Sequence, residues 1–88
     1  MKSAYELALE RSGGALQQIS EAKKADLEEL DILCRSKVAE AEITAENKLK
    51  NLTDPVQILE MKEALANEIR SIRDRYESKK EAVRKRQD

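Results

Sequence analysis

The chain has 88 residues, which suits one domain, and its 17 Lys and Arg nearly balance its 18 Asp and Glu, leaving a net charge of −1. Charged residues make up 40% of the sequence and aromatic residues only 2%, so we do not expect a large globular core. This composition is typical of long helices or coiled coils, and the regular spacing of the apolar residues argues against disorder.

The first predicted element is a short helix over about residues 4–11. Ser3 is followed three residues later by Glu6, which is the spacing of a capping box. The pair Gly13-Gly14 then predicts a turn, because glycine costs about 1 kcal/mol relative to alanine inside a helix.

The strongest break in the sequence is Thr53-Asp54-Pro55. Pro55 lacks an amide hydrogen and clashes with the preceding helical turn, so it ends one helix and fits the first position of the next. Asp54 is disfavoured from helical geometry by the proline that follows it, and it is the expected N-cap. We therefore predict two long helices, over about residues 15–52 and 55–86, within a single helical domain of residues 1–88.

Both long helices carry an apolar stripe that advances in steps of 3, 4 and 4 residues and so repeats every 11. This period favours straight or slightly right-handed packing, although a heptad also fits residues 65–76. We call the two stripes together the seam. It contains Leu16, Ile19, Lys23, Leu27, Leu30, Cys34, Val38, Ala41, Ala45, Leu49 and Leu52 in the first long helix, and Ile58, Met61, Leu65, Ile69, Ile72, Tyr76, Lys80 and Val83 in the second.

A turn at Asp54-Pro55 brings the two halves of the seam together as antiparallel layers. Lys80 interrupts the apolar series of the second helix, and we expect its methylenes to cover Leu30 while its ammonium reaches water. The predicted fold is all-α: a long antiparallel helical hairpin, coiled-coil-like, with a short N-terminal helix. The expected layers are Leu52–Ile58, Leu49–Met61, Ala45–Leu65, Ala41–Ile69, Val38–Ile72, Cys34–Tyr76, Leu30–Lys80 and Leu27–Val83.

Six apolar residues find no partner in this hairpin, which covers only one stripe of each helix. Two of them extend past the end of the second helix, where the short N-terminal helix is expected to turn back over them, and four widen the apolar face. We predict that two hairpins dimerise into a four-helix bundle, or that a partner helix is bound. A monomer with scattered surface Ile and Leu is the alternative. The candidate interface residues are Leu16, Ile19, Ile32, Leu33, Ile43 and Leu59.

No motif typical of an enzyme is present. The sequence has no His, which removes the commonest general base and metal ligand, and Cys34 has no histidine to activate it. Gly13-Gly14 lacks the spacing of a phosphate-binding loop. The Asp and Glu residues lie outside the seam, whereas the carboxylate ligands of di-metal bundles face inward between the helices. We therefore expect no enzymatic activity, no catalytic, cofactor-binding or metal-binding residue, and no small-molecule ligand.

The final helix is the basic part of the chain. Residues 70–88 hold 8 Lys and Arg against 4 Asp and Glu, whereas residues 1–69 hold 9 against 14. These cations complement the negative end of the helix dipole. The alternative is that they contact the phosphates of a nucleic acid, although no aromatic stacking platform accompanies them. The candidate phosphate contacts are Arg70, Arg73, Lys79, Arg84, Lys85 and Arg86.

Neither a secretory leader nor a membrane anchor is visible. The opening residues mix charged and apolar side chains, and no stretch approaches the roughly 20 apolar residues needed to cross a bilayer. The single Cys34 has no partner for an internal disulfide. A lone thiol suits a reducing compartment, so we expect a cytoplasmic protein without a membrane partner.

The opening residues 1–11, MKSAYELALER, resemble those of a group of small uncharacterised bacterial helical proteins that begin Met-Lys-Ser-Ala-Tyr-Glu-Leu-Ala. Residues 31–43, which include KVAEAEI, are similar to the middle region of the same proteins. The resemblance covers about a quarter of the chain and implies a small, charged, helical bacterial protein with no catalytic residue to carry over. The function expected from the sequence is a structural or protein-interaction module that associates through helix packing.

Overall fold

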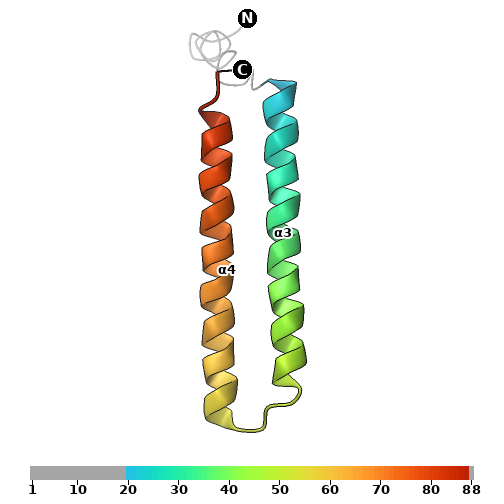
Figure 1. Ribbon diagram of the computed structural model, residues 1–88, viewed down its shortest axis with the longest axis vertical. Helices are drawn as coiled ribbons and strands as arrows, with labels where there is room; N and C mark the ends of the chain where they lie inside the picture. Colours follow the sequence, from blue (N-terminus) through green and yellow to red (C-terminus); the bar gives the residue numbers. More distant parts are fainter. Residues whose placement is uncertain (1–19, 88) are drawn as a thin grey trace, which may run out of the picture.

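The structure, a computed structural model that describes residues 20–87, consists of two long antiparallel helices joined by a short turn (Figure 1). Helix α3 spans Glu21–Leu49 and helix α4 spans Pro55–Arg84, and the two pack side by side along their length. This arrangement confirms the predicted all-α helical hairpin. The short helix predicted over residues 4–11 lies outside the described residues.

Helix α3 begins at a serine cap rather than at about residue 15. The backbone of Ser20 is outside helical geometry (φ −56°, ψ 153°), and its hydroxyl accepts a hydrogen bond from the Lys23 N–H at 3.1 Å. Serine is among the preferred N-cap residues, and Glu21 places a negative charge in the first turn, where the helix dipole favours it. The predicted helix therefore differs from the structure at its start.

The turn lies where the proline predicts it. The Asp54 carboxylate accepts a hydrogen bond from the Val56 N–H at 3.0 Å, so Asp54 is the N-cap and Pro55 opens α4. Helix α3 ends three residues earlier than predicted, at Leu49, because the chain tightens there: the Leu52 N–H donates to the Leu49 carbonyl at 3.1 Å. Helix α4 likewise ends at Arg84 rather than at residue 86.

The core is the seam. Val38, Ala41, Ile72 and Tyr76 form one buried cluster, and Ala45 is buried further along α3. Four seam side chains pack against the cluster: Leu30, Cys34, Leu65 and Ile69. Every predicted seam position within residues 20–87 is buried or half-buried. The apolar period therefore located the face along which the two helices meet.

Three further residues within the described chain are half-buried, and all three are polar: Ser20, Asp26 and Asp31. Ser20 is the α3 cap, Asp31 accepts a hydrogen bond from Lys80, and Asp26 accepts one from Arg86. Outside the seam, the side chains that are partly shielded from water are thus those that form hydrogen bonds, not apolar ones.

Candidate functional site

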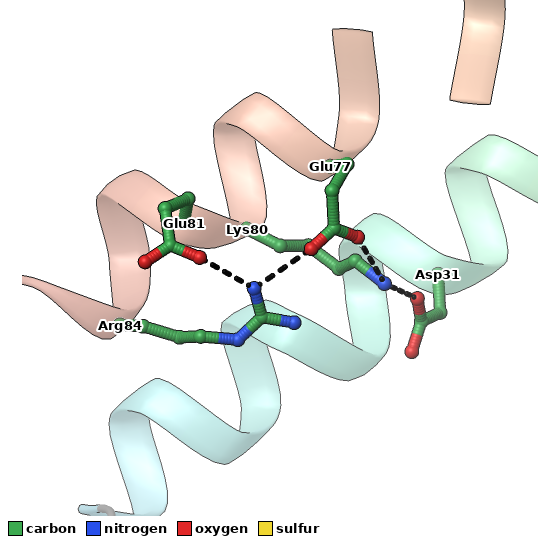
Figure 2. A network of polar contacts seen from close by, with 5 residues as sticks. All are labelled: Asp31, Glu77, Lys80, Glu81 and Arg84. Carbon is green, nitrogen blue, oxygen red and sulfur yellow. Dashed lines mark hydrogen bonds and ion pairs between the residues drawn. The ribbon is translucent and has the colours of Figure 1, made fainter. Parts of the chain in front are cut away.

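A network of five charged side chains joins the two helices (Figure 2). Lys80 Nζ of α4 lies 2.8 Å from Asp31 Oδ1 of α3 and 3.4 Å from Glu77 Oε2. Arg84 Nη1 lies 2.9 Å from Glu77 Oε1 and 3.0 Å from Glu81 Oε2, which extends the network along α4. The Lys80 ammonium thus lies between two carboxylates, and the expectation that it also reaches water stays a prediction.

The pKa values of Asp31, Glu77 and Lys80 shift toward the charged forms. The hydrogen bond from Lys80 holds the pKa of Asp31 below its usual value, and hydrogen bonds from Arg84 and Lys80 do the same to the pKa of Glu77. The bond to Asp31 raises the pKa of Lys80. Asp31, Glu77 and Lys80 are therefore charged at neutral pH, and the bond between Lys80 and Asp31 links α4 to α3.

Hydrogen bonds from the side chains of Lys23 and Arg86 link the two arms at the open end of the hairpin, opposite the turn. Lys23 Nζ donates to the carbonyl oxygen of Arg84 at 3.3 Å and also to that of Arg86. Arg86 Nη1 lies 2.7 Å from Asp26 Oδ2. A lysine at this place neutralises the negative C-terminal end of α4. The sequence signal for this contact was a lysine within the apolar seam at the level where α4 ends.

The candidate phosphate contacts do not form one basic surface. Arg84 and Arg86 are paired with carboxylates of the same chain. Lys79 Nζ lies 4.8 Å from the centroid of the Tyr76 ring, a cation–π contact. The other three, Arg70, Arg73 and Lys85, are exposed. Arg73 and Arg84 are 11 residues apart and lie on one side of α4, whereas Lys79 lies about 120° around the helix from Arg73. Lys85 and Arg86 follow the end of the helix.

The candidate interface residues that the structure describes are all exposed, and they also fall on different sides of the hairpin. Ile32 and Ile43 are each two residues from a seam position, which directs them away from α4. Leu33 lies on the flank of the seam and is 41% exposed. Sequence reasoning missed Val56, which is also exposed. Leu59 belongs to the exposed set too, while Leu16 and Ile19 lie outside the described residues.

Shallow grooves run between the helices on one face of the hairpin. The largest, of about 450 Å³, is lined by Lys37, Glu40 and Thr44 of α3 and by Glu68, Ser71 and Arg75 of α4, among others. A second groove, of about 210 Å³, shares Thr44 and Glu68 with the first and continues to Ala64. Long charged side chains line much of the first groove, together with small ones such as Thr44 and Ser71.

A third groove, of about 280 Å³ and lined by Asp26, Glu29 and Leu33, lies nearer the open end. These three residues precede the α3 residues of the largest groove by one 11-residue period, so all three grooves are on the same side. We call this side the groove face. Glu77 is two residues from Arg75, about 200° around α4, so the charged network of Figure 2 lies on the opposite face.

Comparisons of the chain with family models, with curated proteins and with solved structures found no match. Within residues 20–87, no three His, Cys, Asp or Glu side chains are grouped so as to hold a metal ion. Neither α3 nor α4 combines the length and apolar character needed to cross a membrane. The two faces of the hairpin are therefore the features from which a function is argued.

Proposed function

We propose that the protein is a non-enzymatic association module, and that the partner of the hairpin is a second copy of the chain. The supporting observation is the thin core. Only five side chains within residues 20–87 are buried, two of them alanines, and none of these reaches an exposure below 2%. A single seam of this kind leaves one broad side of each helix in contact with water.

The size of the core strengthens the proposal. Small proteins with thin cores often add disulfides, a metal or oligomerisation to reach stability. The one cysteine in the sequence rules out an internal disulfide. Packing a second hairpin against the first adds the missing apolar contact in the way that four-helix bundles do.

The surface is suited to such packing. The grooves beside the seam are lined by long charged side chains and by small ones such as Thr44, Ala64 and Ser71. Exposed Leu33 lies beside one of these grooves. A face that combines shallow depressions with a projecting leucine allows the side chains of two helix pairs to interlock.

Contact with a nucleic acid is the alternative proposed from the sequence, and the side-chain contacts favour it less. Arg84 and Arg86 are paired with carboxylates of the same chain, which compete with a phosphate for the two guanidinium groups. A basic surface built for phosphates keeps its cations available and clustered on one side.

Sedimentation equilibrium over about 1–100 µM tests the proposal. We expect a species of about 20 kDa, twice the 10.0 kDa chain, and a melting temperature that rises with protein concentration. A 10.0 kDa species at every concentration, with a constant melting temperature, would overturn it. Retention of the nuclease-treated protein on DNA or RNA, lost steeply as salt rises, would instead support the nucleic-acid alternative.

A further inference from the structure

The charges on the groove face of α3 have an internal symmetry. Glu29 and Lys48 lie at equal distances along the chain from the midpoint between residues 38 and 39, and so do Lys37 and Glu40. Reversing the direction of α3 about this midpoint therefore places an acid where a base stood, and a base where an acid stood. Leu33 and Thr44 are related by the same midpoint.

Helix α4 has a matching symmetry at the same level of the hairpin. Glu68 and Arg75, which line the largest groove, lie at equal distances from the midpoint between residues 71 and 72. The two midpoints face each other, because Val38 and Ile72 belong to one buried cluster. A single axis at the level of this cluster thus relates opposite charges on both helices.

From this coincidence we infer that two copies pack through their groove faces as an antiparallel pair, with the turn of each copy beside the open end of the other. A two-fold axis passes at the level of Val38 and Ile72. This inference rests on the proposed self-association and assigns the surface and orientation that it uses. Each acid named above then lies level with a base of the second copy, the kind of complementarity that fixes register.

The opposite orientation, with both turns at the same end, places α3 of one copy over α4 of the other. Because Val38 faces Ile72, Lys37 then comes within two residues of the level of Arg75, and Glu40 within two residues of the level of Glu68. Both encounters bring like charges together at the centre of the interface. The antiparallel pair instead brings the Lys37–Glu40 ion pair of one copy, at 3.5 Å, onto its counterpart with the charges reversed.

Packing agrees with the charges. In the antiparallel pair, Leu33 of one copy lies level with Thr44 of the other, beside the groove of about 210 Å³ that Thr44 lines with Ala45 and Ala64. A leucine opposite small residues is how facing helices interdigitate. The 29 residues of α3 extend about 43 Å, and two helices are about 20 Å wide, which gives roughly 860 Å² per copy, near the standard for a stable interface.

Charge reversal at Glu68 and Arg75 tests the inference. Each single variant, Glu68→Arg or Arg75→Glu, creates two like-charge encounters in a two-fold pair, and we expect the dimer dissociation constant to rise about tenfold or more. The double variant Glu68→Arg/Arg75→Glu restores opposite charges and is expected to return within about threefold of the parent. Arg73→Glu, two residues away on the opposite face, is the matched control and leaves the constant unchanged.

Spin labels at the turn report the orientation. In a Cys34→Ser background, a label at Thr53→Cys is expected about 50 Å from its counterpart in the second copy, since each turn then lies about 17 residues of α4 from the axis between residues 71 and 72. A separation below about 25 Å would show both turns at one end and overturn the inference. A dimer that ignores both charge reversals would also overturn it, while leaving self-association intact. Absence of any dimer of the parent would instead refute the proposed function.

Discussion

Replacing Ile72 by alanine removes three carbon atoms from the centre of the seam. Ile72 is 7% exposed and belongs to the buried cluster with Val38, Ala41 and Tyr76. At about 0.8 kcal/mol for each buried methyl or methylene group, the lost transfer free energy is about 2.4 kcal/mol. Because the seam is narrow and open to solvent on both sides, the void fills or collapses and adds little, so we expect a loss near the low end of the usual 2–5 kcal/mol.

Ile43→Ala is the matched control, since it removes the same three carbon atoms from the side of α3 that faces away from α4. Ile43 is 57% exposed, and alanine is the better helix former, so we expect a change of no more than about 0.5 kcal/mol. Urea denaturation of both variants, followed by circular dichroism at one protein concentration, measures the two losses. Equal destabilisation by the two substitutions would refute the assignment of the core to the seam.

Further predictions follow from the cap and the charged network. Asp54→Ala removes the acceptor for the Val56 N–H and should lower the free energy of unfolding by about 1 kcal/mol, measured by thermal or urea denaturation. Asp54→Ser should stay close to the parent, and an unchanged midpoint in Asp54→Ala would contradict the role of Asp54 as the N-cap. Lys80→Met leaves Asp31 and Glu77 without their shared cation, so we expect a lower melting temperature, which Asp31→Asn in the same chain partly restores. If the effects of the two substitutions simply add, the contact between Lys80 and Asp31 contributes nothing to stability. The folded-state pKa values of Asp31 and Glu77 are lowered, so their contribution to folding stability is complete above their usual pKa values and is lost as the pH falls below about 4.5. The pKa of Lys80 is raised, so its contribution to folding stability is lost only above about pH 10.4. The acid loss, measured as the melting temperature between about pH 3 and 7, should be smaller in Asp31→Asn.

The seam and the turn could be predicted from sequence because both depend on short-range rules. A helix presents every third or fourth residue to the same side, so the apolar series from Leu27 to Val83 identified the covered positions without knowledge of the partner. Pro55 constrains the backbone on both sides of itself, which located the cap at Asp54.

Other features could not be predicted, because they depend on which hydrogen bonds individual polar side chains form. Ser20 starts α3 because its hydroxyl bonds the Lys23 amide, and nothing in the apolar pattern distinguishes that start from one several residues earlier. Lys80 donates a hydrogen bond to Asp31 of the other helix, and an apolar series does not indicate which carboxylate a lysine within it contacts. The groove face was invisible to an apolar series, since small and charged side chains define it rather than large apolar ones.

The connectivity of the hairpin also sets the order in which it forms. Contacts between facing layers join residues that are ever farther apart in the chain: Asp31 and Lys80 are 49 residues apart, and Asp26 and Arg86 are 60 apart. Closing a long loop first costs more entropy than extending a closed turn by a few residues. Folding is therefore expected to start at the capped proline turn and proceed layer by layer toward the open end. The contacts of Lys23 and Arg86 form last in that sequence and are the first to release when the hairpin frays.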